Sequence, residues 1–259
     1  MNYGLCDQAL VPVRVQPGDR QEMTNQLLFG DMVIIKGQVK DWLLVESFDD
    51  QYEGWTDSKQ ILPVSKELFS ELINEERHYV LNLATAGTYI GEDSTYLFTC
   101  GAHLPFFRNN AFRIIDRKGN YSGEIIKPGE KINPEELLRI ANKYLGSPYL
   151  WGGRSPFGID CSGFIQIVFK MAGIMLPRDA SQQVTLGESL NFVDEALPGD
   201  LAFFGNEEGE IIHVGMVVND SHIIHASGKV RVDKLDHQGI YNEEIRKYTH
   251  NLRLVKRFI

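Results

Sequence analysis

Long hydrophobic runs are absent from this sequence of 259 residues, and no stretch reaches the roughly 18 apolar residues that a membrane-spanning helix needs. The N-terminal stretch MNYGLCDQALVPVRV also lacks a basic segment followed by an apolar run, so the sequence predicts no secretory signal peptide. These two absences favour a cytoplasmic protein with no membrane partner. A secreted protein whose signal peptide has already been removed is the alternative.

Cysteine is scarce as well. The sequence holds only Cys6, Cys100 and Cys161, an odd number at wide spacings, without the C-x-x-C pairs typical of metal sites. Free cysteines in this arrangement are typical of a reducing compartment, where disulfides are rare. The cysteine pattern therefore agrees with the predicted cytoplasmic location.

Positive charge is in deficit, since 26 Lys and Arg residues oppose 35 Asp and Glu residues and give a formal net charge of -9. A surface of this sign repels nucleic acid, anionic membranes and anionic wall polymers, so we expect none of them to bind by bulk attraction. A small charged substrate is compatible with the balance, because a local site can oppose the net charge. The remaining composition, 43% hydrophobic and 24% charged, is that of an ordinary globular protein.

The N-terminal half is rich in strand and turn signals. Compact apolar runs such as DMVIIKG and DWLLVES are broken by Gly and Asp, and they predict a small antiparallel barrel over residues 1–65. A second β-rich piece over residues 66–130 holds TYLFTCG, AFRIIDRKG and YSGEIIK. Both pieces carry Tyr-x-Gly after a polar turn, at Tyr52 and Tyr121, which weakly indicates a repeated all-β module.

The C-terminal part, residues 131–259, reads as two helices followed by an antiparallel sheet. In IIKPGEKINPEELL, Asn133 is a candidate N-cap and Pro134 a first helical residue, so a helix is expected from there to about Leu145. A second helix is expected from about Asp160 to Gly173. Strand-like runs follow, namely GDLAFFG, IIHVGMVVN, HIIHASG, VRVDKL and LRLVKRFI. This order predicts an α+β domain.

Cys161 is expected in the first turn of the second helix, directly after Asp160 as N-cap. Backbone N–H groups and the helix dipole at that position favour a thiolate and lower its pKa. Apolar residues share its helix face, so the sulfur should point toward the sheet; they are Ile165, Val168, Phe169 and Ala172. Cys161 is therefore either a nucleophile or a buried small side chain, and the helix by itself favours the second interpretation.

Histidines on two neighbouring strands favour Cys161 as a nucleophile, because a cysteine nucleophile needs a base and the base needs an orienting partner. We expect an odd-length loop at 219–221, which places His213 and His225 on one face as diagonal neighbours. The cross-strand pairs that this loop predicts are Val218 with His222 and Gly215 with His225. His222 and His225 face opposite sides, which disfavours a zinc site. We therefore predict a Cys161–His213–His225 relay, with no metal and no cofactor.

These residues resemble the NlpC family of bacterial cell-wall cysteine peptidases, which have a pared-down papain-like fold. The matching stretches, in the family's order, are YLGSPYLWGGRSPFGIDCSGFIQIVF, LPRDASQQ, LPGDLAFF, HVGMVV and HIIHASG. The resemblance implies that Cys161 is the nucleophile, His213 the base and His225 the residue that orients the base. It also places Tyr149 beside the thiol, where its phenol would help to hold the oxyanion. The alternative for Tyr149 is a half-buried loop aromatic.

The N-terminal half resembles the bacterial SH3-like barrels that precede this catalytic domain in one subgroup. The first barrel matches over EMTNQLLFGDMVIIKGQVKDWLLVESFDDQYEGWT, and the second matches poorly. Enzymes of that subgroup resemble γ-D-glutamyl-L-diamino acid endopeptidases of the dipeptidyl-peptidase VI type. They act on short murein peptides with a free N-terminal L-alanine, and their first barrel narrows one side of the cleft. Two SH3-like barrels before a papain-like domain are thus the expected architecture.

A free ammonium on the substrate needs acceptor groups near the nucleophile. Asp160 is placed to supply one, with Ser162 beside it, although helix capping is the alternative role for Asp160. Tyr52 and Glu22 match barrel positions that line the cleft in the subgroup. The alternatives are a packed barrel aromatic for Tyr52 and a solvated loop carboxylate for Glu22.

The resemblance implies a cysteine peptidase that cleaves the γ-D-glutamyl–diamino acid bond of a small murein peptide and releases L-Ala-γ-D-Glu during recycling. A monomer is the default expectation. One alternative is an acyl- or amide-transfer enzyme on the same scaffold, for which no apolar segment near the site is visible. Another is a binding protein with a vestigial site. A third is a zinc hydrolase that uses His213, His222, His225 and Cys161.

Overall fold

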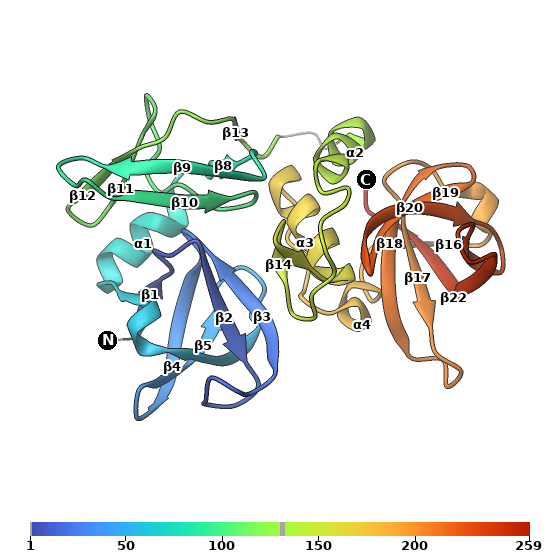
Figure 1. Ribbon diagram of the computed structural model, residues 1–259, viewed down its shortest axis with the longest axis horizontal. Coiled ribbons are helices and arrows are strands. Elements are labelled where there is room, and N and C mark those ends of the chain that lie inside the picture. Colours follow the sequence, from blue (N-terminus) through green and yellow to red (C-terminus); the bar gives the residue numbers. More distant parts are fainter. Residues whose placement is uncertain (1, 130–132) are drawn as a thin grey trace. The chain divides into compact units, whose positions relative to one another are not determined.

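The computed structural model describes residues 2–129 and 133–259, and the chain divides into two compact units (Figure 1). The first comprises Met1–Pro128 and Trp151–Pro156, and the second comprises Gly129–Leu150 and Phe157–Ile259. The chain thus leaves the second unit briefly and re-enters it shortly before Cys161. The predicted boundary between residues 130 and 131 lies outside the described residues.

An antiparallel sheet forms the beginning of the first unit, in the strand order β3-β2-β6-β5-β4-β1-β7. The strands are β1 Tyr3–Leu5, β2 Leu10–Arg14, β3 Met23–Leu28, β4 Met32–Val39, β5 Trp42–Ser47, β6 Glu53–Asp57 and β7 Leu62–Pro63, with the short 3-10 helix η1 Ser58–Gln60 before β7. Buried and less buried residues alternate along β2 and β5, as expected for strands with one face toward a core. The N-terminal region is therefore β-rich and includes a barrel, as the sequence predicts.

The helix α1, Lys66–Asn74, corrects the prediction that residues 66–130 are all-β. The Ser65 side chain accepts a hydrogen bond from the Leu68 N–H and caps the helix. Phe69 and Leu72, three apart on one helix face, are buried. The capping serine and this helical spacing therefore outweigh the β-rich composition of the residues that follow.

The rest of the first unit contains a four-stranded sheet of order β10-β9-β12-β11 and a pair formed by β8 and β13. The strands are β8 Tyr79–Val80, β9 Ala84–Tyr89, β10 Thr95–Thr99, β11 Ala111–Ile114, β12 Arg117–Asn120 and β13 Ile125–Ile126. One core joins this part to the first sheet, since it includes Leu5, Phe29, Phe69 and Phe112. The division into two SH3-like barrels, 1–65 and 66–130, stays a prediction.

The second unit begins with α2, Pro134–Lys143. The Asn133 side chain accepts a hydrogen bond from the Glu136 N–H at 2.8 Å, which confirms the predicted cap. The helix ends at Lys143, two residues before the predicted Leu145.

The second helix of this unit, α3, runs from Cys161 to Ala172 with Asp160 as its N-cap. It ends at Gly173, whose φ of 97° is the left-handed conformation that glycine adopts at helix ends. Both ends agree with the prediction. Every residue of α3 is buried, which places the helix inside the unit against β18. A short helix follows, α4 Ala180–Gln183.

The sheet of the second unit is antiparallel, with the order β16-β22-β17-β18-β19-β20-β21 (Figure 1). Its strands are β16 Glu188–Leu190, β17 Leu201–Gly205, β18 Ile211–Asn219, β19 His222–Ser227, β20 Lys229–Leu235, β21 Gly239–Asn242 and β22 Lys247–Arg257, with the 3-10 helix η2 Val193–Glu195 after β16. An additional pairing of β21 with β22 closes the sheet on itself. The predicted α+β arrangement of helices followed by an antiparallel sheet is confirmed.

Across the described ranges, no helix combines the length and the apolar character needed to span a membrane.

Candidate active site

Cys161 is the first residue of α3, and only 6% of its surface is exposed. The Asp160 side chain accepts a hydrogen bond from the Gly163 N–H at 2.7 Å, which holds the first turn. Backbone hydrogen bonds from Ser162 and from Val214, on β18, reach the thiol. The sulfur therefore points toward the sheet, as the helical pattern predicts.

The expected lowering of the thiol pKa is wrong. Burial raises the pKa of Cys161 to about 12, and the negative charge of Asp160 adds to the rise. Hydrogen bonds from Val214 and Ser162 and the positive charge of Arg178 act in the opposite direction but are smaller. At this helix N-terminus the loss of hydration destabilises the thiolate more than the helix dipole stabilises it. The thiol is thus protonated at neutral pH and needs a base to become a nucleophile.

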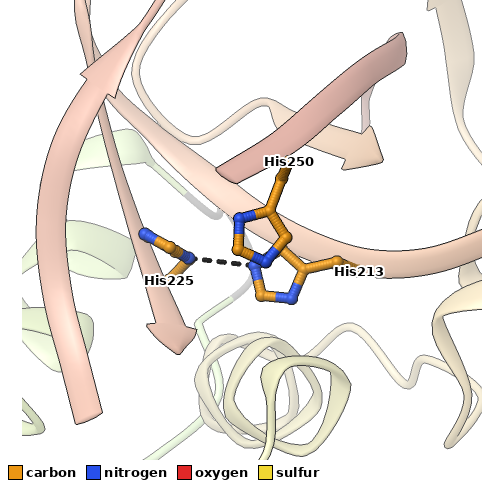
Figure 2. A group of neighbouring side chains, drawn as sticks. All are labelled: His213, His225 and His250. Atoms are coloured by element: carbon orange, nitrogen blue, oxygen red, sulfur yellow. Dashed lines mark hydrogen bonds between the residues drawn. The ribbon is translucent and has the colours of Figure 1, made fainter. Parts of the chain in front are cut away.

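His213 on β18 and His225 on β19 lie on one face of the sheet, as predicted. Gly215 is the cross-strand partner of His225, which makes His213 a diagonal neighbour. The Nε2 atom of His213 lies 2.9 Å from Nδ1 of His225, and both rings are buried (Figure 2). The sheet register therefore brings together two imidazoles that are twelve residues apart in the chain.

The predicted pair of Val218 with His222 is wrong, because Asn219 pairs with His222 instead. Val218 is an extra residue in a β-bulge, and the turn between the strands has two residues rather than three. The bulge restores the register that an odd loop would have given. Nδ1 of His222 lies 3.0 Å from Asn219 Oδ1, so this histidine belongs to the turn and not to the His213–His225 pair.

Asp233 on β20 extends the pair to a chain of three groups. Its Oδ2 lies 3.0 Å from Nε2 of His225, and its Oδ1 accepts a hydrogen bond from Arg231. Burial acts to raise the pKa of Asp233, but the hydrogen bonds from His225 and Arg231 outweigh it and hold this pKa below its usual value. Asp233 is therefore a carboxylate, which can only accept a hydrogen bond from His225.

This fixed acceptor orders the protons along the chain. Since His225 donates from Nε2 to Asp233, its Nδ1 accepts the hydrogen bond from Nε2 of His213. The unprotonated nitrogen of a neutral His213 is then Nδ1. Burial lowers the pKa of His213 well below its usual value, and a positive charge on His250 or His225 would act in the same direction. His213 is thus a neutral imidazole with a lone pair at Nδ1, the form that a general base needs.

His250, on β22, is a third imidazole at the site that the sequence reasoning missed. Its ring stacks on His213, with centroids 4.1 Å apart and planes 25° from parallel (Figure 2). Burial lowers the pKa of His250 to about 4. The predicted last strand began at Leu252, whereas β22 begins at Lys247 and includes His250. Asp233 was also missed, although it lies on a predicted strand.

Asp160 is held by a buried arginine, Arg178, which the sequence reasoning also missed. Nη1 of Arg178 donates to Asp160 Oδ1 at 3.0 Å and to Ser162 Oγ at 2.9 Å, and Nη2 donates to Asp160 Oδ2 at 2.5 Å. The side chains of Arg178 and Asp160 are 1% and 5% exposed. The charge of Asp160 is therefore balanced inside the protein. Its capping role is confirmed, and substrate binding by Asp160 and Ser162 stays a prediction.

Tyr149 lies on the loop before α3, and 37% of its surface is exposed. Burial of part of the ring raises the pKa of Tyr149 to about 12, and a negative charge on the Cys161 sulfur or on Asp160 acts in the same direction. The phenol is thus protonated and close enough to the nucleophile position to sense its charge. Its role at the oxyanion stays a prediction.

Tyr52 and Glu22 belong to the first unit, and their roles in substrate binding stay predictions. Oε1 of Glu22 accepts a hydrogen bond from Nε1 of Trp151 at 2.8 Å. Trp151 is in the segment Trp151–Pro156, which folds with the first unit. Glu22 is therefore a hydrogen-bonded side chain rather than a merely solvated loop carboxylate.

Known proteins with similar sequences indicate the family of this chain. A family model described as the NlpC/P60 family matches residues 146–249. Over 225 residues the chain is 31% identical to the gamma-D-glutamyl-L-lysine dipeptidyl-peptidase of Bacillus subtilis, covering 78% of this chain and 71% of that protein. It is 26% identical over 228 residues to the protein of the same name from Bacillus cereus, covering 79% and 67%.

The fold is shared with a solved structure. A crystal structure of an NlpC/P60 family protein from Bacillus cereus matches with a TM-score of 0.84 over 99% of each chain, at 19% sequence identity. The family model covers the residues of the candidate relay, and the B. subtilis relative aligns over most of the chain. The resemblance deduced from the sequence is confirmed: the chain belongs to the NlpC/P60 family of cell-wall cysteine peptidases.

Proposed function

We propose that this protein cleaves the bond between γ-D-glutamate and the diamino acid in short murein peptides that carry a free N-terminal L-alanine. The observation that carries the proposal is the ordered hydrogen-bond chain from Asp233 through His225 to His213, which leaves His213 ready to accept a proton. The names of the two relatives, which are gamma-D-glutamyl-L-lysine dipeptidyl-peptidases, support this choice of bond. The products would be L-Ala-γ-D-Glu and the diamino acid with anything attached to it.

In the first half of the reaction, Nδ1 of His213 takes the proton of the Cys161 thiol as the sulfur attacks the carbonyl carbon of the γ-glutamyl amide. The resulting oxyanion is stabilised by the Cys161 backbone N–H at the start of α3 and by the phenol of Tyr149. His213, now an imidazolium, gives its proton to the nitrogen of the leaving diamino acid. The C–N bond breaks, and a thioester joins Cys161 to the dipeptide.

The second half returns the enzyme to its starting state. Neutral His213 removes a proton from water while the water oxygen attacks the thioester carbonyl. The C–S bond then breaks, and the departing sulfur takes the proton back from His213. His225 and Asp233 keep the His213 ring in one orientation. They also stabilise its positive form in both halves of the reaction, since the Asp233 carboxylate lies at the end of the hydrogen-bond chain.

Substrate selection is assigned to groups next to the nucleophile and on the first unit. Asp160 and Ser162 are the proposed acceptors for the substrate ammonium, with Tyr52 and Glu22 as further contacts. Arg178 already neutralises the carboxylate of Asp160. A substrate ammonium at this position would therefore bind to a hydrogen-bonded pair and not to an isolated buried carboxylate. We further propose that the N-terminal region comprises two SH3-like modules and that the enzyme acts in the cytoplasm on recycled peptides.

Mass spectrometry of peptide digests tests the proposal. Wild-type protein should release L-Ala-γ-D-Glu from L-Ala-γ-D-Glu-L-Lys or from its diaminopimelate counterpart, and Cys161→Ala should release none. His222→Gln is the matched control for His213→Gln, since His222 belongs to the turn of the same hairpin. We expect His213→Gln to abolish release and His222→Gln to retain it. Equal cleavage of the N-acetylated peptide would overturn the requirement for a free amine.

A further inference from the structure

Three imidazole rings, one of them that of His213, lie close together in the second unit. His213, His225 and His250 come from β18, β19 and β22, and one ring nitrogen from each lies within 4.8 Å of the other two (Figure 2). Each strand belongs to the same sheet, so the three side chains are presented from a rigid scaffold. The proposed reaction needs the first two imidazoles and does not need the third.

We propose that these three histidines form a binding site for a zinc-like divalent metal ion, and that an ion bound there switches the peptidase off. The proposed metal binding does not depend on the peptidase activity. Inhibition rests on the proposed function, because it requires His213 to be the base.

The ligand chemistry fits a borderline transition metal. Neutral imidazole nitrogens suit zinc, copper and nickel, and three histidines with a fourth position open to water form a known zinc ligand set. His225 adds a second feature of such sites, because its outer nitrogen, Nε2, is hydrogen-bonded to Asp233. Metal-binding histidines usually carry a carboxylate or carbonyl at the outer nitrogen, which aims the other nitrogen at the metal. In His225 that inner nitrogen is Nδ1, which faces His213.

The distances require a small rearrangement. Nε2 of His213 and Nδ1 of His225 are 2.9 Å apart, joined by a hydrogen bond. Two nitrogens of a tetrahedral zinc site with bonds of about 2.0–2.1 Å are about 3.3 Å apart. The pair must therefore open by a few tenths of an ångström, and the metal takes the place of the shared proton. The stacked ring of His250 must turn its edge toward the ion, and it is less buried than the other two rings.

An ion at this position disables the base without touching the nucleophile. Metal coordination occupies Nε2 of His213, so the proton of the neutral ring moves to Nδ1. That nitrogen is the one that would accept the proton of the Cys161 thiol. A metal-bound His213 therefore has no lone pair for Cys161, and the thiol stays protonated.

The binding test uses the full chain with Cys161→Ala, which removes both catalysis and the sulfur as a ligand. Cobalt(II) is the spectroscopic probe, and zinc(II) is titrated against it and by calorimetry. We expect one ion per chain with cobalt absorption of a low-coordinate histidine site. His250→Phe, which keeps an aromatic ring on His213, should weaken binding at least about tenfold, and Asp233→Asn about 10- to 100-fold. His222→Gln is the control and should bind as Cys161→Ala does.

In the Cys161→Ala background, either of two outcomes would overturn the site: an unchanged affinity after His250→Phe, or no saturable binding at all. His250→Gln is the second variant, and circular dichroism of both confirms that they fold. In protein that retains Cys161, a sulfur-to-cobalt charge-transfer band would assign the ion to the thiol and would also refute the proposal. These measurements need no substrate, so they stand even if the proposed peptide is not cleaved.

The inhibition test then uses the murein peptide. Zinc should reduce the rate of wild-type protein, and a chelator should restore it. Each variant is compared with its own metal-free rate, and the zinc concentration for half inhibition should rise at least about tenfold in His250→Phe. If zinc binds in Cys161→Ala but has no effect on turnover by wild type, the switch is refuted while the binding site remains.

Discussion

His225 donates its Nε2 proton to the carboxylate of Asp233 across 3.0 Å, and both side chains are buried. This contact determines which nitrogen of His213 is unprotonated, because it fixes the tautomer of His225, which is hydrogen-bonded to both groups. The three groups Asp233, His225 and His213 therefore form a hydrogen-bond chain in which Asp233 fixes where the protons lie. Asp233 is a positioning residue in the proposed reaction.

Replacement of Asp233 by Asn tests that role. The amide can donate as well as accept, so it permits the wrong tautomer of His225 and breaks the order at His213. We expect kcat to fall by about 10²-fold with little change in KM, a smaller loss than the ~10⁴-fold that the same change causes directly beside a catalytic base. Steady-state kinetics on the murein peptide measure both constants. Asp220→Asn, in the exposed turn of the neighbouring hairpin, is the control. An unchanged kcat in Asp233→Asn would show that Asp233 does not orient the His225–His213 pair.

The pH dependence of kcat/KM follows from the two buried reacting groups. Burial is the main cause that lowers the pKa of His213 below its usual 6.5, and a positive charge on His250 or His225 would lower it further. Burial raises the pKa of Cys161 to about 12. The base works only when neutral, so activity should be complete at pH 6.5 and should be lost as the pH falls through the lowered pKa of His213. No alkaline loss from ionisation of the thiol is expected below about pH 10. An acid loss of kcat/KM with its midpoint above pH 6.5 would contradict a resting site with neutral His213 and protonated Cys161.

Much of this site could be predicted from sequence because its signals are local. Asp160 and Gly173 mark both ends of α3, and they are adjacent to the helix that they terminate. The shared face of His213 and His225 follows from the two-residue period of strands and one correct register. The bulge at Val218 could not be predicted, because it depends on how the strands pair and leaves no mark in composition.

The missed residues depend on contacts between distant parts of the chain. Arg231 is the cross-strand partner of His225, so Asp233 is its diagonal neighbour on the same face, and knowledge of the β19–β20 register would have found it. His250 needed both the correct start of β22 and its position in the closed sheet. Arg178 follows α3 by a loop, and only tertiary packing shows that it turns back to Asp160.

The stability of the protein in acid should depend on His250. Its pKa is about 4 in the folded protein, where burial disfavours the charged ring, and near 6.5 when the chain is unfolded. Between these two values the unfolded state binds more protons, so stability falls as the pH falls from about 6.5 to 4. The loss from this one group is about 2–3 kcal/mol. Urea unfolding of wild type and His250→Phe at pH 7 and pH 4 measures it. The variant should lose less stability than wild type over this interval, and equal losses would contradict the lowered pKa.

Arg178 should be among the most sensitive positions in the second unit. Its guanidinium donates to both oxygens of Asp160, and the two side chains are 1% and 5% exposed. Arg178→Met keeps much of the apolar stem but leaves the carboxylate of Asp160 buried without its counter-charge. Breaking a buried pair in this way costs about 3–5 kcal/mol of unfolding free energy.

Arg139→Met is the matched control, since Arg139 pairs with Glu136 on the exposed face of α2 and such pairs contribute less than about 1 kcal/mol. Asp160→Asn combined with Arg178→Met should recover part of the loss, because the double variant removes the unpaired charge while Asn still caps α3. Urea unfolding of the four proteins completes the comparison, and a double variant no more stable than Arg178→Met would show that the charge of Asp160 is not the source of the loss.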